Sequence, residues 1–393
     1  MARDSRYDIL FEPVRIGPVT ARNRFYQVPH CNGMGYAMPN SVAAMRGMKA
    51  EGGWAVVATE ECDIHASTDV LPYREARLWD REDQRRLGLM VDAVHAHDAL
   101  AAVELTHSGH AVSNRYSRLP VMAVSDLPVA SFDPVQAYAM SKRDIASVRR
   151  WHRAAAVRAK EIGFDIVYVY AGHDLTLPMH FLSRRWNRRS DEYGGSLENR
   201  VRLTRELLED THEVVGDTCA VAFRLAVDEL IGDEGVCCDS EGREIVEMLS
   251  ELPDLWDVNI SDWSNDSVTA RFSGEGEQER FASMVVGPGF GTTDEVADGV
   301  RRLVASPGPP MIVDGDGLTD GDEARAYGTD PTETDSDGDG LDDAYDSDAG
   351  GADAPLPNTD GTDEPDWRDV DDDNDGICDD EEDVLNLETE DDP

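Results

Sequence analysis

The sequence predicts an α/β protein with the architecture of a (β/α)8 TIM barrel, incomplete or irregularly closed at its end. Two observations support this class. Short apolar runs alternate with longer amphipathic helical patterns over the first two thirds of the chain, which is typical of βαβ units and a parallel sheet. Polar residues directly follow several of these runs, as expected at the carboxyl ends of barrel strands, where active sites lie.

Six strands are expected before residue 280, at 24–29, 53–61, 100–105, 164–170, 219–225 and 255–260. Predicted helices separate most of them, at 41–51, 82–97, 145–162 and 197–215. The last helix has a good N-cap in Ser196, and Glu198 suits the positive end of its dipole. Six such units favour a barrel over an open sheet.

The most specific motifs surround the fourth predicted strand. This strand ends at Tyr170, His173 follows it, and the string NRRSDEYGGSLENR occupies residues 187–200. Together with VPHC at 28–31, these motifs resemble the old yellow enzyme superfamily of FMN barrels, and within it the trimethylamine and dimethylamine dehydrogenase branch. The resemblance covers roughly residues 1–280 and implies a barrel that binds FMN at its mouth.

The resemblance also implies which residues surround the flavin. Cys31 would form a thioether to the flavin ring, although most cysteines are simply small buried hydrophobic residues. Arg224, at the end of the fifth predicted strand, would stabilise the anionic reduced flavin; the alternative is an ion pair with a neighbouring carboxylate. Further contacts to the cofactor would come from Pro29, His30 and Glu104.

Tyr170, His173 and Asp262 match the catalytic residues of this branch. Because the fourth and sixth strands should end at one rim, we expect these side chains to converge. The histidine would stabilise the phenolate and lower the pKa of Tyr170, and Asp262 would orient the histidine. Tyrosine and histidine are also common at barrel rims without a catalytic role.

Glu61 marks a departure from the trimethylamine enzyme, where the resemblance places an aromatic residue that holds a cation by cation–π attraction. Thr106 replaces a second aromatic wall, and Trp263 could retain one. A carboxylate suits an alkylammonium that still carries N–H bonds. We therefore expect FMN-dependent oxidation of a secondary or tertiary alkylamine to an iminium, with a secondary amine or diamine favoured and an unidentified electron acceptor.

The charge of the chain is extreme, with a formal net charge of −45 and only three lysines. Such a surface suggests a halophilic protein from a high-salt cytoplasm, where salt screens self-repulsion. Nucleic acid and anionic membranes are poor partners for it. No stretch is apolar enough to span a bilayer, so we expect a cytoplasmic protein, with a homodimer as one candidate state.

The six cysteines show no CxxC pairing and no disulfide framework. The amine dehydrogenase branch carries a cysteine cluster for an iron–sulfur centre after its barrel, and then a dinucleotide-binding region. We find neither motif in this sequence and expect no iron–sulfur centre in it.

The composition changes near residue 310, since residues 311–393 hold 33 acidic residues and only two arginines. We expect an FMN-binding barrel at 1–280, a junction at 281–318 and an acidic tail at 319–393. The junction resembles a segment of NAD(P)H-hydrate dehydratase and could supply strands 7 and 8. Its glycines could cradle a phosphate or form an ordinary loop; they are Gly287, Gly289 and Gly291.

The acidic tail contains calcium-loop patterns of the form D-x-D-x-D-G with a carboxylate at position twelve. It resembles thrombospondin type 3 repeats, and the alternative is a disordered acidic tail. A third copy near residue 314 lacks its first ligand because residue 312 is Ile. The expected Ca²⁺ ligands are Asp335, Asp337, Asp339, Asp346, Asp371, Asp373, Asp375 and Glu382.

Two other functions remain open at this point. The first is an ene-reductase of the old yellow enzyme type, which would reduce activated alkenes with NAD(P)H. VPHC, Glu61 and the residues matched to the catalytic set argue against it. The second is a non-catalytic calcium-binding protein in which the barrel is a remnant.

Overall fold

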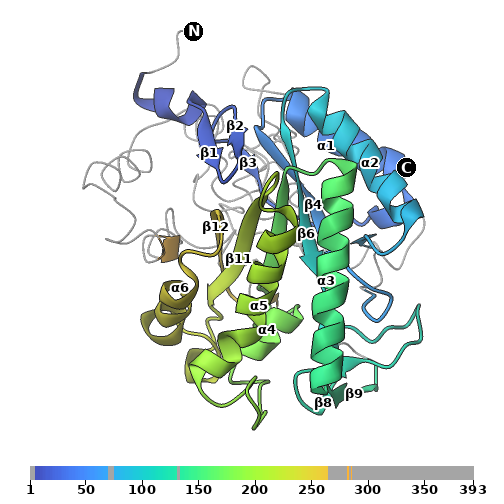
Figure 1. The fold of residues 1–393 in the computed structure, drawn as a ribbon, viewed down its shortest axis with the longest axis vertical. Coiled ribbons are helices and arrows are strands. Elements are labelled where there is room, and N and C mark those ends of the chain that lie inside the picture. Colours follow the sequence, from blue (N-terminus) through green and yellow to red (C-terminus); the bar gives the residue numbers. More distant parts are fainter. Residues whose placement is uncertain (1–4, 70–74, 131–132, 264–280, 283–284, 286–393) are drawn as a thin grey trace, which may run out of the picture. The chain divides into compact units, whose positions relative to one another are not determined.

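A curved parallel sheet is the central element of the described part of the chain (Figure 1). The computed structural model describes residues 5–69, 75–130, 133–263, 281–282 and 285. Within this part, neighbouring strands follow one another along the chain and all pair in parallel. Their order is β3 (Tyr26–Gln27), β4 (Val56–Asp63), β6 (Leu100–Thr106), β10 (Ile166–Ala171), β11 (Ala220–Asp228) and β12 (Leu255–Ile260), and β5 (Ala76–Arg77) pairs with the end of β4.

Burial on both faces explains the sequence of the central strands. All residues of β10 are buried, and so are all residues of β4, which is why these strands read as apolar runs. The six predicted strands are all present, and the predicted (β/α)8 class is confirmed. The two strands that would close the barrel were predicted in the junction, which lies outside the described residues except for residues 281–282 and 285.

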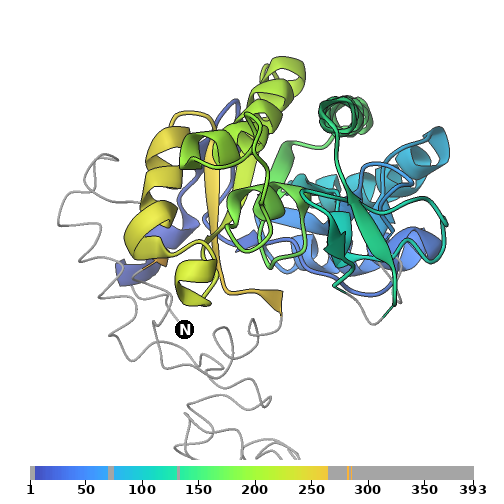
Figure 2. The ribbon, with the colours of Figure 1, turned by 90° about the horizontal axis from the view of Figure 1, so that it is seen from below.

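Helices cover the outer face of the sheet, as Figures 1 and 2 show. Two of them begin with a capping box, in which Asp80 pairs with Asp83 and Ser141 pairs with Asp144. Ser196 caps the next helix by accepting a hydrogen bond from the Asn199 backbone, as predicted. These helices are α1 (Pro39–Glu51), α2 (Arg81–His95), α3 (Lys142–Ile162), α5 (Leu197–Val215) and α6 (Arg243–Leu249).

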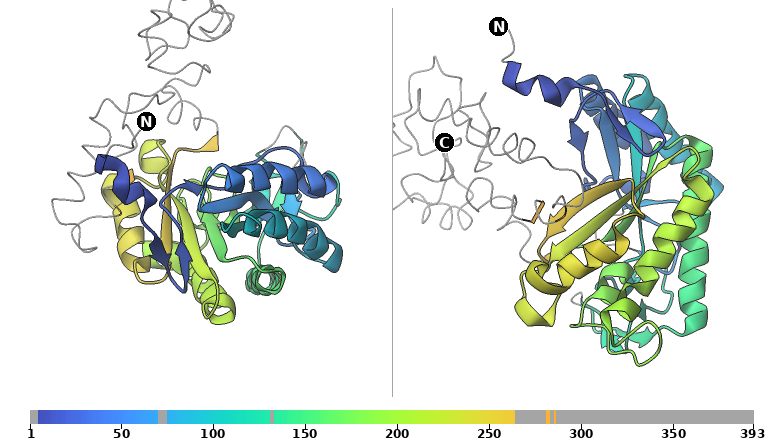
Figure 3. Two further views of the ribbon diagram at one scale, coloured as in Figure 1. Left: turned by 90° about the horizontal axis from the view of Figure 1, so that it is seen from above. Right: turned by 60° about the vertical axis from the view of Figure 1, so that its left-hand side comes forward.

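The core has two layers, one on each face of the sheet. The larger one packs between sheet and helices and includes Val167, Val169 and Phe223. The smaller one lies on the inner face and consists mainly of alanines around Ile166 and Tyr168. An antiparallel hairpin of β1 (Val14–Ile16) and β2 (Val19–Ala21) adds to this inner cluster, and Figure 3 shows it beside the parallel strands.

Several short elements were not predicted from the sequence. They include α6, β5, α4 (Leu177–Leu182), a small sheet of β7 (Met122–Ala123), β9 (Gln136–Ala139) and β8 (Leu127–Pro128), a π-helix at Cys238–Gly242, and 3₁₀-helices at Ser5–Phe11, Gly35–Ala37, Gly109–Ala111 and Gly232–Glu234. Elements of two to seven residues are too short to show a hydrophobic period.

All the elements named above belong to one compact unit of the chain. None of the described helices is long and apolar enough to cross a membrane. The predicted boundaries at 280 and 318, the three junction glycines and all eight predicted calcium ligands lie outside the described residues.

Candidate active site

The inner face of the sheet changes character along the strands. Near their amino ends, inward positions hold small apolar residues such as Ala58, Ala102 and Ala222. Nearer the carboxyl ends, neighbouring strands align polar residues, with Glu61 opposite Glu104, Tyr170 opposite Arg224, and Arg224 opposite Asp257. A register shift between Ala58 and Glu61 brings the Glu61 side chain to this face. Polar groups from five segments of sequence therefore meet at one rim.

Arg224 lies at the centre of this rim. Its Nη1 donates to the Pro29 carbonyl at 3.1 Å and to Glu104 Oε1 at 3.2 Å. Its Nε lies 3.6 Å from Asp257 Oδ2, and its guanidinium carbon is 5.5 Å from the centroid of the Tyr170 ring. Burial disfavours the charge on Arg224, but Glu104 and Asp257 outweigh burial and raise its pKa. Arg224 is thus a fixed cation that links the Cys31 loop to three strands.

Tyr170 and His173 form the pair that the sequence predicted. The Tyr170 hydroxyl is hydrogen-bonded to His173 Nδ1, and the Asn259 amide Nδ2 lies 3.1 Å from His173 Nε2. Because this amide nitrogen can only donate, Nε2 accepts, and Nδ1 is left as the protonated nitrogen that faces Tyr170. Asn259, on β12, therefore fixes the orientation and the tautomer of the imidazole.

The pKa of Tyr170 differs from the sequence expectation. We expected His173 to lower it, but burial of the phenol, and then the nearby Glu104, raise it well above its ordinary value, against the opposing effect of Arg224. The expectation of a lowered pKa is therefore wrong. Desolvation of a fully buried phenolate outweighs one favourable hydrogen bond.

Asp262 and Trp263 follow β12 and lie beside His173. The backbones of His173 and Asp262 form a parallel bridge, and the Trp263 amide donates to the His173 carbonyl at 2.9 Å. The Asp262 carboxylate lies 3.9 Å from Arg185 Nη1. Both loops have non-glycine residues with positive φ, namely His173 at 55° and Ser261 at 77°, a strained conformation that is common at functional sites. Trp263 is 62% exposed.

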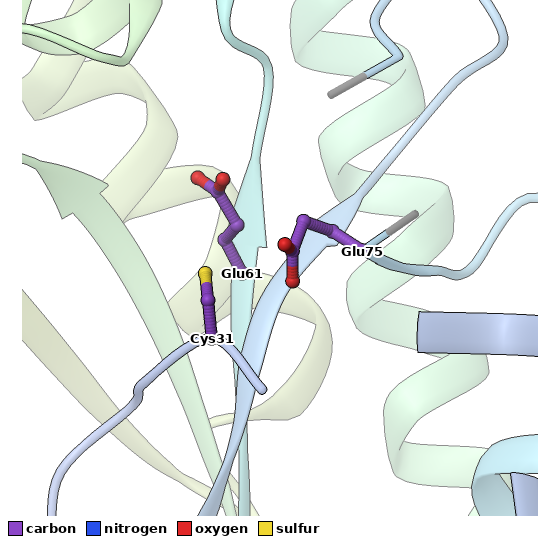
Figure 4. A group of neighbouring side chains, drawn as sticks. All are labelled: Cys31, Glu61 and Glu75. Atoms are coloured by element: carbon purple, nitrogen blue, oxygen red, sulfur yellow. The ribbon is translucent and has the colours of Figure 1, made fainter. Parts of the chain in front are cut away.

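Cys31, Glu61 and Glu75 form a second group of functional side chains at the rim (Figure 4). The Cys31 Sγ and one carboxylate oxygen from each glutamate all lie within 4.8 Å of one another. Cys31 belongs to an exposed loop, but its sulfur points towards the two buried glutamates. Burial, followed by the charges of Glu61 and Glu75, raises the pKa of the Cys31 thiol. The thiol is therefore protonated at neutral pH.

Four buried carboxyl groups lie near this thiol. Burial is the first cause in each case and raises the pKa of Glu61 to about 8, of Glu75 to about 9 and of Glu104 to about 7. Repulsion between the acids adds to the shift, since Glu104 acts on Glu61, and Glu60 acts on Glu75. Burial also raises the pKa of Glu60, which is hydrogen-bonded to Glu75. The cluster therefore holds several protons at neutral pH.

A buried arginine, Arg46, contacts both the backbone and the side chain of His30. Arg46 donates to the His30 carbonyl at 2.8 Å and lies 3.0 Å from His30 Nδ1, and Gln27 lies 2.9 Å from the same nitrogen. Burial and then the Arg46 charge lower the pKa of His30 to about 4. His30 is therefore neutral, and these contacts fix the backbone that leads to Cys31.

The residues of this rim fit a flat polar ring such as that of FMN. Buried polar atoms without a hydrogen-bond partner converge here from neighbouring strands, and FMN offers donors and acceptors for such atoms. Arg224 would supply a cation beside such a ring and would stabilise the negative charge that the ring gains on reduction. Among the described residues, the buried side-chain atoms here without a hydrogen-bond partner are Glu61 Oε2, Thr106 Oγ1, Asn259 Oδ1, Arg224 Nε and Asp257 Oδ2, the last two of which lie 3.6 Å from each other.

Sequence reasoning missed four residues of this site. Asp257 and Asn259 alternate along β12 with outward Trp256 and Val258, so the period of two could have found them. Glu60 and Glu75 carried no such signal. Glu60 owes its place to the irregular register of β4, and Glu75 precedes β5, which pairs with the end of β4.

Comparison with known proteins agrees with this geometry. Residues 9–305 match the NADH:flavin oxidoreductase / NADH oxidase family. Dimethylamine dehydrogenase from Hyphomicrobium sp. (strain x) is 44% identical over 282 residues, which are 69% of this chain and 38% of that protein. Residues 314–333 match the bacterial TSP3 repeat, in the region of the incomplete third calcium loop.

Two solved structures are similar in fold and sequence. Histamine dehydrogenase from Rhizobium sp. 4-9 is 49% identical with a TM-score of 0.69, over 72% of this chain and 41% of that one. The 6-hydroxypseudooxynicotine amine oxidase from Pseudomonas geniculata N1 is 45% identical with a TM-score of 0.72, over 77% of this chain and 47% of that one. This chain thus spans less than half the length of these relatives. The family match over most of the sequence, on a curved parallel sheet with a polar rim, shows that the chain belongs to the NADH:flavin oxidoreductase / NADH oxidase family.

Proposed function

We propose that this protein is an FMN-dependent oxidoreductase that oxidises the C–N bond of an alkylamine to an iminium. The observation that carries the proposal is the convergence of Cys31, Glu61, Tyr170 and Arg224 on one rim. The names of the three relatives refer to dimethylamine, histamine and 6-hydroxypseudooxynicotine as the compounds oxidised, which supports an amine substrate. A separate electron acceptor would then reoxidise the protein.

Arg224, Glu104 and the Pro29–Cys31 loop would hold the cofactor, with a thioether from the Cys31 sulfur to its ring. FMN would accept the two electrons and one proton of a hydride equivalent. The guanidinium of Arg224 is held against carboxylates and a carbonyl before the reaction begins, so it needs no reorganisation to stabilise negative charge on the reduced ring.

The remaining residues would prepare the substrate. Glu61 would bind the ammonium nitrogen, and Tyr170, whose hydroxyl oxygen accepts from His173 Nδ1, would exchange the proton of its own hydroxyl with the substrate. Asn259 holds the imidazole in place, and Asp262 lies beside it through the backbone bridge. Trp263, exposed at the rim, would form one wall of the substrate site. Water would hydrolyse the released iminium to an aldehyde and a smaller amine.

The proposal is tested by mixing the yellow protein with dimethylamine or NADH in the absence of oxygen and recording the flavin absorbance. We expect bleaching by the amine and a rate about 10²-fold lower in Tyr170→Phe, since a positioned acid–base group contributes about that much. Acid precipitation should leave the pellet yellow in the wild type and colourless in Cys31→Ala. The proposal is wrong if NADH alone bleaches the flavin, which would favour the ene-reductase alternative.

For the rest of the chain we propose the organisation expected from the sequence. The barrel would extend to about residue 280, the junction to 318 would supply the closing strands, and residues 319–393 would bind Ca²⁺. The match to the TSP3 repeat supports the last point. Calorimetric titration with Ca²⁺ tests it, and an absence of calcium-dependent heat would contradict it. The acidic composition supports a cytoplasm of high salt as the setting.

A further inference from the structure

The group formed by Cys31, Glu61 and Glu75 contains more carboxylates than one substrate contact needs. Glu61 and Glu75 are each 5% exposed. Each has one carboxylate oxygen, Oε2, that is buried and has no hydrogen-bond partner among the described residues. An unpaired buried carboxylate oxygen is costly, so a donor that belongs in this space would satisfy both.

We propose that Glu61 and Glu75 together bind a single ammonium head group through two N–H bonds, and that binding releases one proton to solvent. This inference rests on the proposed function, since it names the chemistry of the substrate at that site. Glu75 becomes a specificity-determining residue, which favours primary and secondary ammonium ions over tertiary and quaternary ones.

The separation of the ligand atoms fits one tetrahedral nitrogen. Two oxygens that each accept a charge-assisted N–H bond of about 2.8 Å from the same nitrogen lie about 4.6 Å apart. One carboxylate oxygen of Glu61 and one of Glu75 lie no more than 4.8 Å apart, which leaves room for this arrangement. Figure 4 shows both carboxyl groups beside the Cys31 sulfur, so the head group would sit next to the point where the flavin is expected to be attached.

The charges around the site explain the release of a proton. In the free protein, burial and mutual repulsion keep the Glu61 and Glu75 carboxyls protonated at neutral pH. A bound ammonium ion offsets that repulsion and stabilises the carboxylate form of one glutamate. That glutamate therefore loses its proton to the buffer and forms an ion pair with the ammonium ion. The charged and titratable groups that face the pair are Cys31, Glu60, Glu104, Tyr170, Arg46 and Arg224.

The experiment is calorimetric titration of the flavin-loaded chain, with the flavin reduced so that bound amine is not oxidised. Dimethylammonium offers two N–H bonds, trimethylammonium one and tetramethylammonium none. We expect each lost N–H bond to weaken binding about tenfold, because a hydrogen bond to a charged group contributes that much. Titrations at pH 7 in buffers of different ionisation enthalpy should report about one proton released.

Glu75→Gln keeps the size of the side chain and removes the acidic proton, so the side chain cannot become a carboxylate when the ammonium ion binds. It should bind dimethylammonium at least tenfold more weakly, lose the preference for N–H bonds and release less of the proton. Glu75→Asp, which keeps the charge, should restore part of the preference. Glu244→Gln, on the exposed first turn of α6, serves as the matched control and should behave as the wild type.

The outcomes separate this inference from the proposed function. If Glu75→Gln keeps the wild-type affinities and proton release while amines still bleach the flavin, the inference is overturned and the proposed function stands. If dimethylammonium binds with proton release but no amine bleaches the flavin, the inference stands alone. A thiol and two carboxyls also suit a divalent metal ion, so Zn²⁺ is titrated as well; Zn²⁺ binding without ammonium binding would overturn the inference.

Discussion

The two ends of the same strands differ in what their inner faces contain. At the amino ends, Ala55, Ala102, Ala220 and Ile166 pack together with Ile16 from the hairpin, and all of them are buried. At the carboxyl ends, a few residues further along the same strands, the inner face carries buried glutamates, Arg224 and several polar atoms that have no hydrogen-bond partner in the described part of the chain. One end of the sheet is thus apolar and well packed, whereas the other end is polar and leaves hydrogen-bonding groups unsatisfied.

This difference indicates which end of the sheet stabilises the folded state and which end destabilises it. Burial of apolar area stabilises the amino end without any ligand. Buried acids with raised pKa values and unpaired polar atoms destabilise the carboxyl end until a ligand satisfies them. Changes at the polar end should therefore alter ligand binding and pH dependence, and changes at the apolar end should alter stability alone.

The largest effect is expected from Arg224→Met. The methionine fills similar space but leaves Glu104 and Asp257 facing each other without their cation. We expect a loss of about 3 kcal/mol in the free energy of unfolding, since removal of one partner from a buried pair is strongly destabilising, together with loss of bound flavin. Urea unfolding and the flavin absorbance measure both quantities.

Arg153→Met is the matched control, because Arg153 forms an ion pair with Glu213 at 2.7 Å on the exposed side of α3. Such pairs contribute less than about 1 kcal/mol. Equal losses in the two variants would contradict the distinction between the polar rim and the surface.

The pH dependence of stability should change in Glu61→Gln. In the folded protein the pKa of Glu61 is raised to about 8, whereas in the unfolded chain it is near 4.3. Between these values the folded state keeps a proton that the unfolded state has lost, so stability falls as pH rises through this window. Glu61→Gln should be more stable than the wild type at pH 8, on the order of 3 kcal/mol, and similar to it at pH 4.

The measurement is urea unfolding of the flavin-free protein from pH 4 to pH 8.5. The exposed Glu244→Gln should follow the wild-type curve throughout. If the stabilities of Glu61→Gln and the wild type run in parallel over this range, Glu61 does not hold its proton in the folded state.

The smallest effect is expected at the apolar end. Ile166 is fully buried on the inner face of β10, and Ile166→Val removes one methylene group without adding a polar one. We expect a loss of about 1 kcal/mol in the free energy of unfolding, with unchanged affinity for dimethylammonium. A change of tenfold or more in that affinity would show that the two ends are coupled.

The sequence predicted the framework well because each strand is a local pattern. The predicted strand 255–260 and helix 197–215 agree with β12 and α5 in both bounds. The fifth strand continues three residues beyond its predicted end, to Asp228. The register with β12 shifts between Ala226 and Asp228. Such an irregularity leaves no pattern in the local sequence, so the end of this strand was predicted too early.

By itself, the sequence determined the barrel class, the order of its strands and the residues at the strand ends. These follow from short-range patterns, because parallel strands joined by helices present their carboxyl ends to one side. Only the tertiary structure decided that Glu75 lies beside Cys31, that Asn259 holds His173, and that burial raises the pKa of Tyr170. Desolvation and charge act through space, so these contacts and pKa values depend on residues that are far apart in the chain.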